Sequence, residues 1–316
     1  MPSPTLPLVS IIIPVYNGRA YLAQAIESAL NQSYPNIELL VIDDGSTDGG
    51  EAARIADAYQ GRVHYIKKEN GGVSSALNIG IASMKGEYFS WLSHDDVYHH
   101  RKISSQISLI NRLGKPRQIV TDGYILFNDS KGIVGSLDIA GVYPQKRFEA
   151  PLFPVFHCAL NGCAMLIHKS HFDRVGLFDE SKRTTQDYDM WFRMLRGQKA
   201  VYGRQFVLYS RVHSEQVSVS IKTEHEAECT NLWINLLEQL TDDEMIAMAG
   251  SVKAFSDDVY SHFLYRTSYR GVCEYIKARW NPDEISAPLY SFSRIKGLRL
   301  LRAKAEFYQW RNKQHA

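Results

Sequence analysis

Strand-like and helix-like segments alternate over the first 95 residues, and this alternation restricts the fold more than any other feature of the sequence. Residues 9–13 are Val, Ser and consecutive Ile residues ended by a proline, which is typical of a strand buried in a parallel sheet. Further strand-like segments lie at 38–42, 63–66 and 88–92, and helix-like segments at 20–32, 51–59 and 74–84. Such repetition with short Gly- and Asp-rich connections predicts an α/β fold around a right-handed, mostly parallel sheet.

The pattern becomes less regular after residue 115 and then changes character near residue 220. Mixed strands are expected at 118–127, 163–168 and 201–209, with a helix at 187–196. From about residue 223 the leucines recur close to helical spacing, and the rest of the chain reads as helical. We therefore expect a catalytic or binding domain over residues 1–220 and a helical region over residues 221–316.

The composition excludes several classes of protein. Of 316 residues 45% are hydrophobic and 22% charged, so a large core is expected, and a net charge of +2 gives no footprint for nucleic acid. The four cysteines form no C-x-x-C pair, which argues against a zinc ribbon or a thioredoxin-type site. No apolar run reaches the length of a membrane span or a signal peptide. We expect a cytoplasmic protein whose membrane contact is limited to its surface.

Polar clusters follow the first, second and fourth predicted strands. They are Pro-Val-Tyr-Asn-Gly at residues 14–18, Asp-Asp-Gly-Ser-Thr-Asp-Gly at 43–49 and Trp-Leu-Ser-His-Asp-Asp at 91–96. Each cluster alone could be a turn, a solvated loop or a helix cap, and capping explains Asp48 well. Ligands of open α/β sheets bind beyond the carboxyl ends of the strands. The position shared by the three clusters therefore predicts a ligand site.

Two pairs of adjacent aspartates stand out, because neighbouring carboxylates are costly unless a cation or hydrogen-bond donors meet them. Hard divalent cations prefer carboxylate oxygens and neutralise a departing diphosphate. The pair Asp95-Asp96 suits such a metal, whereas Asp43-Asp44 needs another partner. Known phosphate loops do not fit: Glu51 and Ala52 replace the Lys and Ser/Thr of a P-loop, and no G-x-G-x-x-G follows the first strand.

Two later clusters are weaker by themselves. Gln-Asp-Tyr-Asp-Met-Trp at residues 186–191 begins a helix, where acids are common because of the helix dipole. Residues 211–218 contain His213, and a lone histidine is more often structural than a ligand.

Taken together and in this order, these segments resemble the family 2 glycosyltransferases of the GT-A fold. That family shows P-x-Y-N, [DE]DGS-x-D, N-x-G-x-x-x-A-x-N-x-G, an aspartate pair and E-D-x-D-x-W. The matching segments here are residues 14–17, 43–48, 70–80, 95–96 and 187–191, followed by His213, Gln216 and Ser218 of a late His-x-x-Gln-x-Ser. The resemblance covers residues 8–220. It implies a Rossmann-like, mostly parallel sheet with helices on both faces, followed by the helical region.

The resemblance also implies roles for individual residues. Those expected at the nucleotide-sugar donor are Pro14, Tyr16, Asn17, Asp44, Asn70, Gly72, Asn78 and Asp95. Tyr16 would stack on the base, and Asp44 would accept the N–H of a uracil or thymine ring. Asp95 and His213 would hold Mn²⁺ or Mg²⁺, with Asp96 in support, although Ser93 replaces an aspartate common in the family's metal motif. Asp187 would be the general base.

The implied activity is inverting transfer of a sugar from a nucleotide diphosphate, with UDP expected, to an acceptor hydroxyl. The acceptor would be a carbohydrate or lipid-linked glycan in cell-surface glycan assembly. One alternative is a nucleotidyltransferase, whose G-x-G-T-R signature is missing after the first strand. Another is an inactive sugar-nucleotide-binding or scaffold protein, suggested by Ser93. Retention of Asp95, Asp187 and His213 argues against that decay.

The segment 294–313 carries seven Lys or Arg and one acidic residue, interleaved with Leu, Phe and Trp. This pattern is typical of a helix on a membrane surface, and equally of a solvated helix packed on the main domain. Peripheral membrane contact through residues 294–316 is therefore one of two open interpretations.

Overall fold

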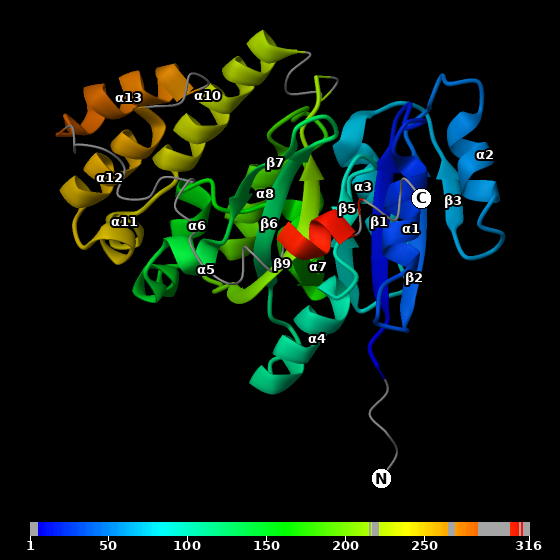
Figure 1. Ribbon diagram of the computed structural model, residues 1–316. Helices are drawn as coiled ribbons and strands as arrows, with labels where there is room; N and C mark the ends of the chain where they lie inside the picture. The colour runs from blue at the N-terminus through cyan, green and yellow to red at the C-terminus, as the bar shows by residue number, and fades with distance from the viewer. Residues whose placement is uncertain are drawn as a thin grey trace.

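The computed structural model describes residues 6–214, 216, 221–264, 269–283, 304–309 and 311. Within this part of the chain the strands form one nine-stranded sheet of order β3-β2-β1-β4-β8-β6-β9-β5, with β7 paired to β6 (Figure 1). Helices cover the sheet, and a group of helices, α10 to α13, lies beside α6 at one side of the molecule (Figure 1).

The first half of the sheet is parallel, as the sequence predicts. Its strands are β1 (Val9–Val15), β2 (Ile37–Asp43), β3 (His64–Lys67) and β4 (Tyr88–Trp91), connected through α1 (Leu22–Leu30), α2 (Glu51–Asp57) and α3 (Gly72–Ser83). The chain reverses direction along the sheet after β3, so right-handed connections place α3 on the face opposite to α1 and α2. Every residue of β1 is buried, which explains its β-branched, apolar sequence.

The second half of the sheet mixes parallel and antiparallel pairs. Its strands are β5 (Val97–Tyr98), β6 (Val120–Asn128), β7 (Gly132–Leu137), β8 (Met165–His168) and β9 (Val201–Arg211). β8 runs antiparallel to both β4 and β6 and thereby joins the two halves, while β6 and β9 are parallel. Strands occur at each of the three segments expected after residue 115, and the α/β fold class is confirmed.

Helices and short helical turns fill the connections of this second half. They are α4 (Lys102–Leu113), α5 (Ile139–Val142), η1 (Gln145–Glu149), α6 (Phe153–Phe156), η2 (Gly162–Ala164), α7 (Ser170–Val175) and α8 (Gln186–Leu195). α8 buries Trp191 and Phe192 in the main core, and this anchors the helix that begins with the candidate base.

The helical region consists of α10 (Lys222–Glu238), α11 (Asp242–Ala249), α12 (Val252–Leu264) and α13 (Arg270–Trp280). Trp233 of α10 is almost fully buried, with ring centroids 5.8 Å from Phe156 and 5.4 Å from Tyr188. Its neighbours from α6 and α8 belong to the same hydrophobic cluster as the sheet. The helical region and the sheet therefore share one core, and a domain boundary near residue 220 stays a prediction.

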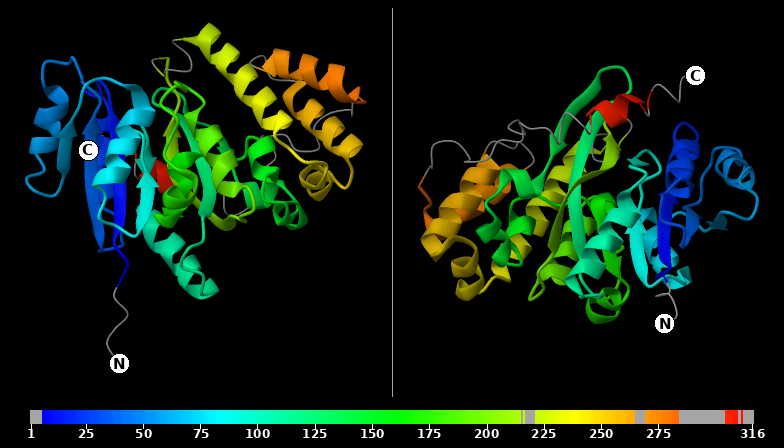
Figure 2. Two further views of the ribbon diagram at one scale, coloured as in Figure 1. Left: turned by 180° about the vertical axis from the view of Figure 1, so that it is seen from behind. Right: turned by 60° about the horizontal axis from the view of Figure 1, so that its bottom comes forward.

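The described C-terminal residues, 304–309 and 311, fold back onto the sheet (Figure 2). Phe307 is fully buried, with ring centroids 5.2 Å from Phe127 and 5.3 Å from Tyr209. Glu306 pairs with His99 at 3.0 Å. The rest of the segment 294–316 lies outside the described residues. No helix in the described part of the chain is long and apolar enough to span a membrane.

Candidate active site

The loops after β1 and β2 are joined by the side chain of Asn17. Asn17 has a positive φ of 53° and donates its backbone N–H to Ser46 Oγ at 2.9 Å, while its Oδ1 accepts the N–H of Thr47 at 2.8 Å. Tyr16, next to it, has 46% of its surface exposed, so its ring is free to contact a ligand. Pro14 lies in β1, opposite Ile42 of β2. Asn17 therefore lies against the second cluster, with the exposed ring of Tyr16 beside it in the chain.

Asp43 shapes the second loop from inside the protein. Its fully buried carboxylate accepts the N–H of Ser46 at 2.7 Å and the hydroxyl of Tyr65. Burial opposes ionisation, but the hydrogen bonds from Tyr65 and Ser46 outweigh it, so the pKa of Asp43 is lowered. Asp43 is thus an ionised structural residue.

Asp44 connects the second loop to residues 68–72. Its carboxylate accepts Lys68 Nζ at 2.7 Å and the backbone N–H groups of Gly71 and Gly72 at 2.9 and 2.7 Å. The Asn70 side chain in turn donates to the Asp44 carbonyl oxygen at 2.9 Å. The structure therefore brings together three of the residues expected to bind the nucleotide-sugar donor, Asp44, Asn70 and Gly72.

Gly45 is required where these two segments meet. Its φ is +74°, and an added Cβ would lie 2.7 Å from the backbone nitrogen of Asn70. Both the left-handed backbone and the close approach exclude a side chain at this position. The glycine of the D-D-G-S segment thus allows the Asp44 loop to contact residues 68–72.

Asn78 is also expected to bind the nucleotide-sugar donor, but its side chain contacts the loop between α7 and α8. Its amide donates to the Phe178 carbonyl oxygen at 3.0 Å and to Glu180 Oε1 at 2.9 Å, and its oxygen accepts the Phe178 N–H at 2.9 Å. These bonds use both hydrogens and the oxygen of a buried side chain. Asn78 fixes the loop between α7 and α8, which carries the chain toward Asp187.

The third cluster meets the late histidine, as the sequence leads us to expect. Asp95 Oδ2 and His213 Nε2 are 2.9 Å apart, with side chains 14% and 16% exposed. His213 Nδ1 is buried without a hydrogen-bond partner among the described residues. A carboxylate and an imidazole separated by 118 residues thus face each other at the end of β4.

The Asp95–His213 pair fits a divalent cation. Octahedral Mg²⁺ with bonds of about 2.0–2.1 Å separates adjacent ligand atoms by about 3 Å, close to the spacing of this oxygen and nitrogen. Carboxylate oxygen and imidazole nitrogen together suit Mn²⁺ as well. The described residues contain no cluster of three His, Cys, Asp or Glu side chains around one point. Asp95 and His213 would be two of the ligands, and phosphate oxygens and water suit other positions of the coordination sphere.

Asp96, expected in a supporting role, is buried and turned toward β9. Its Oδ1 accepts the backbone N–H of Arg211 at 2.8 Å. Burial, together with the negative charge of Asp95, raises the pKa of Asp96. Asp96 thus holds the loop that carries Asp95 against the strand that leads to His213.

Arg211 has a role that sequence reasoning missed. Its side chain is 2% exposed and donates Nε to the Asp95 carbonyl oxygen at 2.9 Å, which fixes the Asp95 loop. The guanidinium lies between the rings of Tyr21 and Phe127, at 4.2 and 4.6 Å from their centroids. A basic residue two positions before His213 was the available signal, but its partners come from distant parts of the chain.

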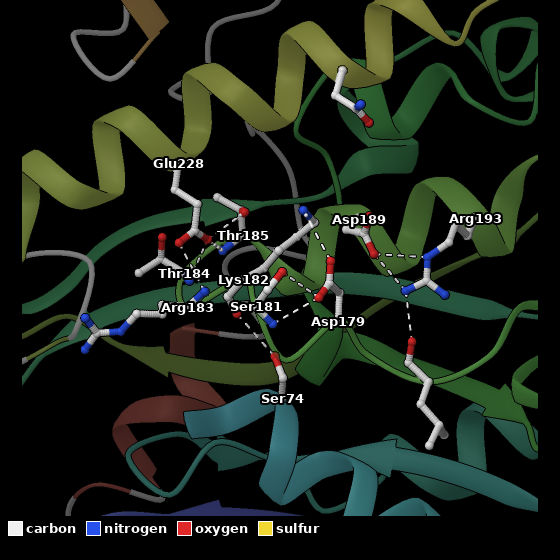
Figure 3. A network of polar contacts seen from close by, with 12 residues as sticks. Ser74, Asp179, Ser181, Lys182, Arg183, Thr184, Thr185, Asp189, Arg193 and Glu228 are labelled. Atoms are coloured by element: carbon white, nitrogen blue, oxygen red, sulfur yellow. Dashed lines mark hydrogen bonds and ion pairs between the residues drawn. The ribbon is translucent and has the colours of Figure 1, made fainter. Parts of the chain in front are cut away.

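Asp187 lies in the first turn of α8, as expected for the base. Its Oδ1 accepts the N–H of Tyr188 at 2.8 Å. Burial raises the pKa of Asp187 to about 6, with a smaller contribution from the charge of Glu228. Asp189, the other acid of the motif, is paired with Arg193 at 2.7 Å and also holds α8 (Figure 3). Asp187 is therefore the carboxyl suited to take up a proton near neutral pH.

Comparison with known proteins identifies the family to which this chain belongs. Residues 10–173 match the family described as glycosyl transferase family 2. An uncharacterized glycosyltransferase of Rickettsia felis is 42% identical over 268 residues, which are 85% of this chain and 44% of the relative. A second, from Rickettsia prowazekii, is 43% identical over 263 residues, 83% of this chain and 81% of that protein. The chain spans about half or less of the length of several curated relatives.

Solved structures agree with the fold. Staphylococcus aureus TarS in complex with UDP aligns with a TM-score of 0.55 at 16% identity, covering 85% of this chain and 87% of that one. The mannosyltransferase PcManGT of Pyrobaculum calidifontis in complex with GDP-Man and Mn²⁺ gives 0.58 at 16% identity, covering 100% and 86%. The GT-A fold expected from the sequence is confirmed.

Proposed function

The chain belongs to glycosyl transferase family 2, and on that premise we propose that it is an inverting enzyme. It moves a sugar from a nucleotide diphosphate donor, with UDP as the first candidate, to an acceptor hydroxyl. The observation that carries this proposal is the half-buried carboxyl of Asp187 in the first turn of α8, whose pKa is raised to about 6, while the neighbouring acid Asp189 is paired with Arg193. A general base working near neutral pH needs such a carboxyl.

The donor would lie over the loops at the ends of β1, β2 and β4. Tyr16 is exposed enough to stack on the base, and Asp44 keeps a lone-pair position beyond its three hydrogen bonds for a ring N–H. The diphosphate would lie at Asp95 and His213, where Mn²⁺ or Mg²⁺ would neutralise the charge that develops on the leaving group.

The transfer itself is a single displacement. The acceptor oxygen forms a bond to the anomeric carbon on the face opposite the diphosphate, and its proton passes to Asp187. The bond between the anomeric carbon and the diphosphate oxygen breaks, and its electron pair leaves with the nucleoside diphosphate. A positioned base contributes about 10²–10⁴-fold to such a rate. The acceptor class we propose is a carbohydrate or lipid-linked glycan of the cell surface, by analogy with the family.

The test is a panel of UDP- and GDP-sugars incubated with the protein and Mn²⁺, with release of nucleoside diphosphate as the readout. We expect metal-dependent hydrolysis of one donor, and faster release when an acceptor sugar is added. Binding of a nucleoside diphosphate with no turnover of any donor or acceptor would instead support the inactive sugar-nucleotide-binding protein.

Peripheral membrane contact through the basic residues of 294–316 stays a second, separate proposal. Removal of the whole segment is a poor test, because it also removes Phe307 from the core. Neutralising Arg294, Lys296, Arg299 and Arg302 with glutamine should reduce pelleting with anionic vesicles. The matched control neutralises the exposed residues Arg62, Arg112, Lys115 and Lys146. Equal pelleting of the two variants would contradict membrane contact.

A further inference from the structure

We propose that Glu228, on α10 of the helical region, is a positioning residue for the general base Asp187. It holds the turn that leads into α8, and so fixes where the carboxyl of Asp187 meets the acceptor. The inference depends on the proposed function only for the role of Asp187 as the base. Residue 228 lies beyond the part of the chain that matches the family, which ends at residue 173.

The contacts of Glu228 all converge on residues 183–185 (Figure 3). Oε1 accepts the backbone N–H groups of Thr184 at 2.9 Å and Thr185 at 2.8 Å, and also the Thr185 hydroxyl at 2.7 Å. Oε2 accepts the N–H of Arg183 at 3.1 Å. One carboxylate therefore accepts hydrogen bonds from three consecutive backbone amides. Such a set fixes the backbone more firmly than a single side-chain contact can.

The turn has no equivalent support from its own sequence. Thr185 is the N-cap residue of α8, but its side chain makes no capping bond to the helix. Its hydroxyl donates to Glu228 on α10. His225, one turn earlier on α10, adds a contact of 2.8 Å between Nδ1 and Thr184 Oγ1. Since Asp187 follows Thr185 by two residues, the position of its carboxyl depends on α10.

The pKa values of Glu228 and Asp187 are shifted in opposite directions. Burial opposes ionisation of Glu228, but hydrogen bonds from Thr184, Thr185 and Arg183 outweigh it and lower the pKa of Glu228. Its negative charge then adds to burial in raising the pKa of Asp187 to about 6. When the environments of two acids push their pKa values apart, the acid with the lower pKa stays ionised and the acid with the higher pKa exchanges protons near neutral pH.

The negative charge of Asp189, two residues further along α8, is paired with Arg193 at 2.7 Å. Tyr188 adjoins Asp187 on α8, and Cys229 adjoins Glu228 on α10. Burial raises the pKa of the Tyr188 hydroxyl, and it raises the pKa of the Cys229 thiol to about 12, so both are neutral at pH 7. Cys158 lies close to Tyr188, and His225 faces Thr184. Glu228 is therefore the anionic neighbour whose removal should be felt by Asp187.

The experiment compares Glu228→Gln with Glu224→Gln in the full chain. Glu224 lies one turn earlier on the same helix and is exposed, so its substitution removes the same charge without touching residues 183–185. The Asp187 carboxyl is followed by ¹³C NMR in protein labelled at the aspartate carboxyl carbons, with the signal assigned by its loss in Asp187→Asn. We expect Glu228→Gln to lower the titration midpoint of Asp187 by about half a unit or more, and Glu224→Gln to leave it unchanged.

Kinetics give the second readout. Glu228→Gln should lower kcat about tenfold while leaving the KM for the donor near the wild-type value, because the donor loops lie on other elements. A folded Glu228→Gln protein with an unchanged Asp187 midpoint and an unchanged kcat would overturn the inference. If wild-type protein transfers no sugar, the proposed function fails, whereas the NMR comparison still decides whether Glu228 acts on Asp187.

A milder pair of variants covers the case in which Glu228→Gln does not fold. Thr185→Ala removes the hydroxyl that donates to Glu228 and leaves α10 intact, whereas Thr185→Ser keeps a hydroxyl at the same position. We expect kcat to fall severalfold in Thr185→Ala, with the KM for the donor unchanged, and to recover in Thr185→Ser. Equal kcat in the two variants would contradict positioning through this turn.

Discussion

The donor loops and the helix that carries Asp187 are held in place by different kinds of contact. On the donor side, neighbouring loops of one parallel sheet bind each other through backbone amides, as Asp44 does with Gly71 and Gly72, 27 and 28 residues away. On the base side, the turn before α8 is held by Glu228, 43 residues after Thr185 and on a different group of helices.

Because the two regions are held by different contacts, we expect donor binding and the transfer step to respond to different substitutions. The donor loops follow from strand order, because parallel strands bring their carboxyl ends to the same edge. The position of Asp187, the proposed base, depends on how the helical region packs on α8 through Trp233. Substitutions near Asp187 should therefore affect kcat with donor binding intact, whereas those near Asp44 and Asp95 should affect donor binding first.

The largest expected effect comes from Asp187→Asn. The amide keeps the size of the side chain but cannot accept the acceptor's proton, so kcat should fall by about 10²-fold or more. Donor and metal affinity, measured by calorimetry with nucleoside diphosphate and Mn²⁺, should stay near wild type. The variant should be at least as stable as the wild type at pH 8, since it removes a charge whose burial is unfavourable.

Asp189→Asn is the matched control on the same turn of α8. It breaks the pair with Arg193 and should lower the thermal midpoint, yet leave kcat within severalfold of wild type. If instead Asp189→Asn abolished transfer and Asp187→Asn did not, the assignment of the base would be wrong.

Asp95→Asn should affect binding of the nucleotide donor, in contrast to the substitutions on α8. An amide is a much poorer ligand for a hard cation than a carboxylate, so Mn²⁺-dependent affinity for a nucleoside diphosphate should fall at least about tenfold. Metal-free affinity should change little, because Tyr16 and Asp44 remain. Calorimetry with and without Mn²⁺ checks this, and an undiminished metal effect would place the cation elsewhere.

The pH dependence of transfer should report the protonation of Asp187. Because the pKa of Asp187 is raised to about 6, kcat should fall about tenfold for each pH unit below 6 and level off above it. Stability runs the other way. The folded state binds this proton more tightly than the unfolded chain, whose aspartates titrate near 3.9, so raising the pH from about 4 to about 6 removes stability. A kcat profile flat down to pH 5 would contradict Asp187 as the base.

The smallest effect we predict is that of Gly45→Ala, judged against Gly49→Ala. Both glycines have positive φ, +74° and +71°, but an added Cβ contacts nothing at Gly49 and meets the Asn70 backbone at Gly45. Backbone strain alone costs about 1–2 kcal/mol and should appear in both variants by denaturant unfolding. Only Gly45→Ala should also weaken nucleotide binding, because residues 68–72 must shift. Equal binding by both variants would show that the contact with residues 68–72 is dispensable.

Much of the donor side could be predicted from the sequence. A buried β-branched run ended by Pro14 and aspartates at the strand ends gave the right sheet, and local rules of chain geometry produce both. The pairing of Asp95 with His213 was expected only from the resemblance to a family. No spacing rule connects residues 118 positions apart.

The remaining contacts could not be predicted, because they depend on tertiary packing. Glu228 looks like any other acid on an amphipathic helix until α10 is placed on α8. Arg211 reads as a basic residue near a strand end until Tyr21 and Phe127 enclose it. Asn78 belongs to a motif with donor residues, yet its amide binds the loop at Phe178 and Glu180. Each of these roles requires knowing which elements lie side by side.

The core shared by α6, α8 and α10 has a consequence for how the protein matures on the ribosome. β1 to β4 are synthesised first and have the local contacts needed to form the parallel half early, whereas Trp233 and Glu228 emerge after the whole sheet has been translated. Until they arrive, the turn before α8 lacks its hydrogen-bond acceptor and Tyr188 lacks its aromatic neighbour. We therefore expect a nascent chain that acquires affinity for nucleotide before it acquires the ability to transfer sugar.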